Sequence, residues 1–181
     1  MKTKRRFPAR IAFISDEIAE LPLRNVWQKK QTLLVKNEIS DLLFAQGAFS
    51  NNKFFIPLFN YFCIFAAEQI MRNIRDTESD FMADCSLEVI YALDHELHDQ
   101  KFEGDLLARV RTLQHEANHT TVKSTLQTGY SYLLNNCNKI IALHNGENPT
   151  VARLLSKARL RGISIKTIDP ALNRNSFFCL G

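Results

Sequence analysis

The chain has 181 residues, a formal net charge of +4 and only 6 glycines, at positions 47, 104, 129, 146, 162 and 181. No two of them form a Gly-x-Gly pair, which excludes the Walker P-loop, the dinucleotide fingerprint and the nucleophile elbow, because these motifs need close-set glycines. Much of the positive charge lies in the first ten residues. The rest of the chain is therefore close to neutral, and nucleic acid is not an expected partner.

The first half of the chain alternates predicted strands and helices. Residues 10–15 form a short apolar run that predicts a buried strand, and residues 26–46 carry apolar side chains at helical spacing. Residues 53–58 predict a second strand, in which Pro57 must sit at the end because a central strand needs its backbone N–H donors. Residues 62–75 predict another helix with a mostly apolar stripe.

The second half continues this alternation. Three further strands are predicted, at residues 87–93, 139–143 and 163–168. Three further helices are predicted, at residues 104–113, 123–135 and 149–160. The last helix has the best-defined ends, because Asn148 suits the N-cap, Pro149 suits the first turn and Gly162 ends it.

Together these elements predict an α/β fold, a single Rossmann-like domain of about five mainly parallel strands with helices on both faces. The predicted domain covers residues 10–170, between a basic arm of residues 1–9 and a C-terminal tail of residues 171–181. The most apolar stretch, residues 54–67, is shorter than the roughly 20 residues that cross a bilayer. No membrane partner is therefore expected.

Polar residues follow the predicted strands. Ser15 ends the first strand, and Asn60 comes directly after the second. In open parallel sheets, ligands bind outside the carboxyl ends of the strands, at the point where the strand order reverses. The polar groups at these ends are mainly carboxylates and amides, which suit ribose hydroxyls or a base edge better than a bare polyphosphate.

The segment before the last helix carries the features of a weak anion site. It offers Asn145, Gly146 and Glu147, followed by Thr150 in the first helical turn. Free N–H groups at a helix N-terminus attract anions, and the Thr150 hydroxyl adds a donor. The alternative is that Asn148 and Pro149 form only a helix cap.

Residues 115–119 read His-Glu-Ala-Asn-His and match the H-E-x-x-H zinc motif. On one helix, His115 and His119 would share a zinc ion and Glu116 would activate its water. The apolar periodicity stops after His115, and Asn118 favours caps and turns over helix interiors. A zinc metalloprotease is therefore the minor alternative, and no metal site is assigned.

The four cysteines lie at positions 63, 85, 137 and 179. None belongs to a C-x-x-C pair of the kind that binds zinc or exchanges electrons. Isolated thiols in apolar surroundings are typical of a reducing compartment, so a cytoplasmic location is expected.

The C-terminal third resembles the SLOG superfamily of Rossmann-like domains, which includes DNA-processing proteins and cytokinin-activating phosphoribohydrolases. The resemblance rests on residues 132–147 (YLLNNCNKIIALHNGE), on 150–152 and on 158–163, with Ala66-Ala67-Glu68 and residues 10–15 as weaker matches. It implies a nucleotide-derived ligand, and matches Gly146, Glu147, Thr150 and Glu68 to site positions.

This chain departs from the family pattern at two turns. The family has glycines after the second strand and before the last helix, where this chain has residues 58–61 (LFNY) and Asn148-Pro149. Glycine allows close approach of the backbone to a phosphate. The resemblance therefore implies an altered phosphate-binding loop.

Three functions are left open beside the zinc alternative. The first is binding or sensing of a nucleotide or nucleotide derivative, with no cofactor assigned. The second is hydrolysis of an N-glycosidic or phosphoribosyl bond, for which Glu68, Asp94 or Glu147 would supply the carboxylate. The third is a degenerate scaffold without activity. A homo-oligomer remains open in each case.

Overall fold

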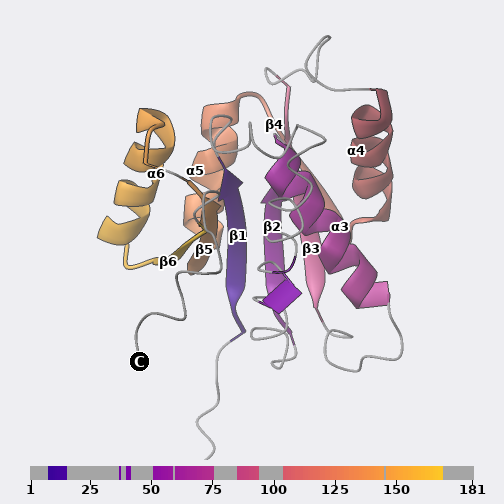
Figure 1. The fold of residues 1–181 in the computed structure, drawn as a ribbon, viewed down its shortest axis with the longest axis horizontal. Helices are drawn as coiled ribbons and strands as arrows, with labels where there is room; N and C mark the ends of the chain where they lie inside the picture. Colours follow the sequence, from indigo (N-terminus) through magenta and orange to yellow (C-terminus); the bar gives the residue numbers. More distant parts are fainter. Residues whose placement is uncertain are drawn as a thin grey trace, which may run out of the picture.

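The computed structural model describes residues 8–15, 37, 40–41, 51–58, 60–75, 85–93, 104–144 and 146–168. Its strands are β1 (Arg10–Ser15), β2 (Lys53–Pro57), β3 (Ser86–Ala92), β4 (His119–Lys123), β5 (Lys139–Leu143) and β6 (Ser164–Ile168). Its helices are α3 (Tyr61–Arg75), α4 (Gly104–Glu116), α5 (Leu126–Asn136) and α6 (Pro149–Leu160). All six strands are parallel, in the order β4-β3-β2-β1-β5-β6 (Figure 1).

The strand order reverses once, between β1 and β5. From β1 the chain adds β2, β3 and β4 in one direction, and it then returns to place β5 and β6 on the other side of β1. Ser15, the last residue of β1, lies in register with Leu143, the last residue of β5. This reversal is the position at which parallel α/β sheets bind ligands.

The predicted α/β fold with a parallel sheet is confirmed, with six strands rather than five. The missed strand is β4, whose residues His119 and Thr120 are exposed. The sequence places His119 in the H-E-x-x-H motif and predicts a helix from Lys123, whereas α5 begins at Leu126. Because β4 lies at the edge of the sheet, it needs no continuous apolar run. Its strand conformation comes from pairing with β3, which a local pattern does not reveal.

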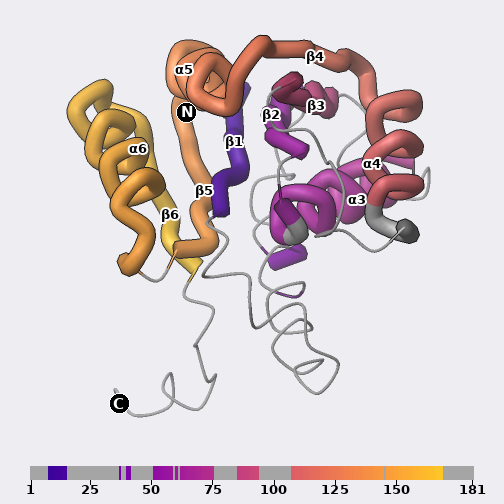
Figure 2. Tube along the Cα trace, turned by 90° about the horizontal axis from the view of Figure 1, so that it is seen from above, coloured from indigo at the N-terminus to yellow at the C-terminus, as the bar shows by residue number. Residues whose placement is uncertain are grey.

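Helices cover both faces of the sheet, α3 and α4 on one and α5 and α6 on the other (Figure 2). Alternate side chains of β1 enter opposite cores, with Ile11 and Phe13 on the α3 face and Ala12 and Ile14 on the α6 face. These four residues are fully buried. The continuous apolar run of β1 therefore follows from its burial on both faces.

Two predicted features of element ends are confirmed, although β2 ends one residue before the predicted bound. Pro57 is the last residue of β2, a central strand, where its missing N–H disturbs no internal ladder bond. Asn148 is the N-cap of α6, and Pro149 is in its first turn.

The helix predicted at residues 26–46 lies outside the described residues except for positions 37, 40 and 41, which are helical. No helix in the described ranges is long and apolar enough to cross a membrane.

Candidate functional site

The carboxyl edge of β1 is joined to the start of α3 through Asn60. The Asn60 Nδ2 donates to the backbone oxygen of Ser15 at 3.2 Å, and the Asn60 Oδ1 accepts from the Cys63 backbone N at 3.1 Å. Asn60 and Ser15 are both buried. The two residues predicted from strand ends therefore lie together, and the Asn60 side chain holds β1 against the helix.

The loop after β5 brings three further predicted residues to the same edge. Gly146 has φ = +93°, a conformation that L side chains rarely adopt, and a Cβ at this position would meet no atom within 4 Å. Glu147 and Thr150 are exposed. Asn145, predicted as part of this group, lies outside the described residues. The edge between β1 and β5 thus combines an open glycine turn with hydroxyl and carboxylate groups.

The N-terminus of α6 is capped by its own chain. The Asn148 Oδ1 accepts from the backbone N of Thr150 at 2.9 Å and from that of Val151 at 3.3 Å. The next N–H, of Ala152, bonds to the Asn148 backbone oxygen at 3.0 Å, and Pro149 has none to offer. The donors that would cradle a phosphate are therefore already engaged, as the cap alternative anticipated.

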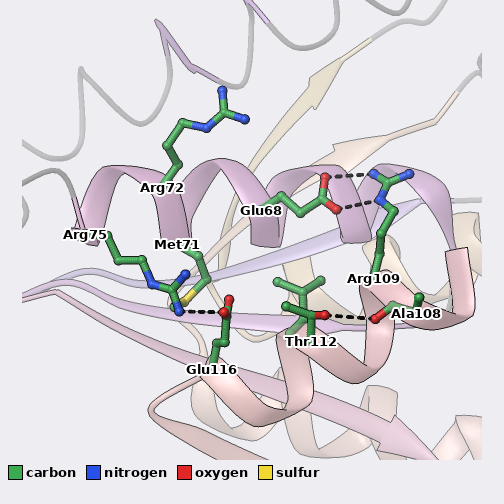
Figure 3. Close-up of a pocket in the computed structure, with 9 residues that line it drawn as sticks. Glu68, Met71, Arg72, Arg75, Ala108, Arg109, Thr112 and Glu116 are labelled. Carbon is green, nitrogen blue, oxygen red and sulfur yellow. Dashed lines mark hydrogen bonds and ion pairs between the residues drawn. The ribbon is translucent and has the colours of Figure 1, made fainter. Parts of the chain in front are cut away.

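Glu68 lies apart from these residues, in a groove between α3 and α4 (Figure 3). Its carboxylate forms a bidentate ion pair with Arg109, with Oε1–Nε and Oε2–Nη2 distances of 2.6 and 2.7 Å. Arg109 also lies over the ring of Phe65. Glu68 points from α3 toward α4, so the structure does not bring it to the edge between β1 and β5.

The groove itself has a volume of about 650 Å³. A second ion pair, between Arg75 and Glu116 at 2.9 Å, crosses it further along the helices. Its apolar lining includes Met71 and Leu113, which are both buried. Ion pairs across a helix–helix groove brace the two helices, and this is the role that the contacts give to Glu68.

The H-E-x-x-H segment does not form one helix. The helix α4 ends at Glu116, and His119 is the first residue of β4. Glu116 is paired with Arg75, and the Asn118 Oδ1 accepts from the Leu87 backbone N at 2.8 Å. The two histidines therefore lack the one-turn helical spacing of the zinc motif. Within the described part of the chain, no group of three or more His, Cys, Asp or Glu residues is placed to hold a metal ion.

A buried charged cluster that the sequence analysis did not identify surrounds Glu88 of β3. Glu88 is 3% exposed, and its Oε1 accepts from the hydroxyls of Thr121 and Tyr132, both at 2.6 Å. Its Oε2 lies 2.9 Å from the Nζ of Lys53. The partners come from β4, α5 and β2, so the cluster joins two strands and a helix to β3. The only sequence signal was one acidic residue within an otherwise apolar strand.

The environment of Glu88 favours its charged form. Burial alone raises the pKa of Glu88, but the hydrogen bonds from Thr121, Tyr132 and Lys53, with the Lys53 charge, outweigh burial and hold this pKa below its ordinary value of 4.5. The hydrogen bond to Glu88, together with burial, raises the pKa of Tyr132. The carboxylate is therefore ionised and the phenol protonated in the folded protein at neutral pH.

The stability of the fold is expected to depend on the charge of Glu88 in acid. Because the folded pKa is below the unfolded value, the contribution of Glu88 is present above about pH 4.5 and is lost as the pH falls through the folded pKa. In Glu88→Gln the Oε1 keeps the two hydroxyl bonds, but an amide NH₂ faces the Lys53 ammonium, which costs about 1–2 kcal/mol at pH 7. Urea unfolding at several pH values should show this difference from wild type shrinking below pH 4.5; a constant difference would contradict the assignment.

The comparison with protein-family models gives no match for this chain, and neither does the comparison with curated proteins. The site is therefore defined by its geometry and by the motifs of the chain itself.

Proposed function

We propose that this protein binds a nucleotide-derived small molecule at the carboxyl edge of the sheet, between β1 and β5, and acts as a sensor of that molecule. The observation that carries the proposal is the Gly146 turn, which has a positive φ and open space around it and follows β5 at the strand-order reversal. Ligands of parallel α/β sheets bind at such reversals, and glycine turns let the backbone approach them. The resemblance to the SLOG superfamily supports the same ligand class.

The capped α6 N-terminus favours recognition of the nucleoside part of the ligand over its phosphates. The N–H groups of Thr150 and Val151 are bonded to Asn148, so an anion there would have to displace this cap. The exposed Glu147 carboxylate is an acceptor for ribose hydroxyls or for the amino groups of a base. We therefore propose that a nucleoside and its monophosphate bind with similar affinity.

Replacing Gly146 with alanine is expected to remove ligand binding. The matched control is Gly162→Ala at the end of α6, because Gly162 also has a positive φ, +72°, and also has no atom near a Cβ. Each substitution is expected to destabilise the fold by about 1 kcal/mol. Thermal-shift titration with a panel of nucleosides and nucleotides should give a stabilising shift in wild type and in Gly162→Ala but not in Gly146→Ala.

Two outcomes of this experiment would count against the proposal. One is that no member of the panel stabilises the wild-type protein at millimolar concentration. The other is that Gly146→Ala and Gly162→Ala respond alike, which would mean that the turn after β5 does not touch the ligand. The variants Glu147→Ala and Thr150→Ala alter exposed side chains and should weaken the shift.

The same panel separates sensing from hydrolysis of an N-glycosidic bond. Hydrolysis needs a carboxylate beside the ribose, and Glu68 is engaged with Arg109 away from the proposed site. Glu147 keeps a carboxylate at the proposed site, so we propose binding as the first function and hydrolysis as the second. Release of free base from the panel that is lost in Glu147→Gln would favour hydrolysis over sensing. The described cysteines 63, 85 and 137 are buried, and buried cysteines in apolar surroundings support the proposal of a cytoplasmic location.

A further inference from the structure

The strand β4 forms one edge of the described sheet, and its residues His119, Thr120 and Val122 are exposed. It pairs with β3, and no other described strand pairs with it. Leu93 N donates to Lys123 O at 2.9 Å, which directs the polar backbone groups of Lys123 toward β3. Because backbone groups alternate along a strand, those of Thr120 and Val122 point away from the sheet. An unpaired edge of this kind is a template for pairing with another chain.

Apolar side chains are exposed at the same edge. Among the described residues, three large hydrophobic side chains are strongly exposed: Leu93 at 56%, Val122 at 55% and Leu160 at 89%. Val122 lies in β4, and Leu93 directly follows β3, where its backbone N donates to the Lys123 oxygen. The edge therefore offers apolar surface beside its unpaired backbone groups.

We propose that β4 is a dimerisation edge, at which a second copy of this chain pairs antiparallel to continue the sheet. The sequence His119-Thr-Thr-Val-Lys123 suits its own copy when the two-fold axis passes through Thr121. In that register Thr120 of the first copy pairs with Val122 of the second, and Val122 of the first copy pairs with Thr120 of the second. The outward N–H and C=O groups of these residues then form four backbone hydrogen bonds, and none is left over.

The side chains support this register. Thr120 and Val122 lie on one face of β4, so each β-branched side chain meets a β-branched partner across the interface, a favourable cross-strand pair. The Thr120 Oγ1 is already bonded to the Gln114 backbone oxygen at 2.9 Å, which leaves its methyl group for packing. The edge carries no acidic residue, and its one lysine, Lys123, lies over the ring of Tyr132. A two-fold axis is also the commonest symmetry of soluble homodimers.

Val122→Lys tests the edge, because a charge on an exposed edge strand blocks strand pairing. Its matched control is Leu160→Lys, which places the same side chain at an exposed leucine on α6. In sedimentation equilibrium, wild type and Leu160→Lys should reach twice the 20.8 kDa chain mass, whereas Val122→Lys should weaken dimerisation by about tenfold or more. A wild type that stays monomeric up to about 1 mM, or a Val122→Lys variant that dimerises equally well, would overturn the proposal.

Disulfide crosslinking tests the register. With the axis at Thr121, the two Thr121 residues face each other at a Cα separation of about 4.5 Å, within the range that a disulfide bridges. In a Cys179→Ser background, Thr121→Cys should form a reducible dimer under mild oxidation. Val122→Cys should not, because the two copies of residue 122 are offset beyond about 7 Å. Crosslinking of Val122→Cys alone would overturn the register.

Discussion

Replacing Glu88 with alanine is expected to lower the free energy of unfolding by about 2–4 kcal/mol, the cost of leaving buried hydroxyl donors without their acceptor and of opening a cavity. The substitution leaves three donors without their acceptor: the hydroxyls of Thr121 and Tyr132 and the ammonium of Lys53. Lys53 is 37% exposed and can turn toward solvent. The loss is therefore expected to come mainly from the two hydroxyl groups and the cavity left by the side chain.

Glu116→Ala is the matched control for this substitution. Glu116 also pairs with a single cation, Arg75 at 2.9 Å, but the two side chains are 28% and 55% exposed. An ion pair with this much solvent access contributes at most about 1 kcal/mol. Chemical denaturation of both variants at pH 7 provides the measurement. Equal losses in the two variants would contradict the conclusion that the Glu88 cluster joins β2, β4 and α5 to β3.

The second large effect is expected at Asn60. Asn60→Ala should cost about 2–3 kcal/mol, because it removes both the cap bond to Cys63 N and the buried bond to the Ser15 carbonyl. The control is Asn148→Ala, which removes an asparagine N-cap from α6. Asn148 is half-buried and bonds only within its own helix turn, so its loss should cost about 1 kcal/mol.

Urea unfolding of these two variants measures the difference. If both losses are near 1 kcal/mol, the bond from Asn60 to Ser15 contributes nothing and the carboxyl edge of β1 is held by other contacts. If the loss at Asn60 is larger, the same variant should also weaken ligand stabilisation at the proposed site, because Ser15 is part of that edge. Asn148→Ala frees two N–H groups and should leave nucleoside binding intact.

The elements that the sequence predicted well are those with a strong local pattern. Residues 10–15, 139–143 and 149–160 were predicted with the bounds that the structure shows. The apolar runs of β1 and β5 reflect burial on both faces, and the adjacent Asn148 and Pro149 mark the start of α6. In each case the physical cause lies within a few residues, so the pattern is readable without knowledge of the fold.

The candidate site was predictable only in part. Ser15, Asn60 and Gly146 were placed correctly at strand ends because parallel strands bring their carboxyl ends to one edge. Glu68 was assigned from a resemblance, and the structure pairs it with Arg109, which is 41 residues away in the chain. Nothing in the local pattern of α3 identifies this arginine, because the partner depends on how α3 and α4 pack together.

The sequence by itself determined the alternation of strands and helices except for β4, the two-sided burial of the central strands and the capped start of α6, because these are marked by patterns of neighbouring residues. Only the tertiary structure decided that His119–Lys123 is a strand with an open edge, that Glu88 is a buried anion with three partners, and that the reversal lies between β1 and β5. These features depend on sheet register and on helix packing, which join groups more than 30 residues apart in the chain.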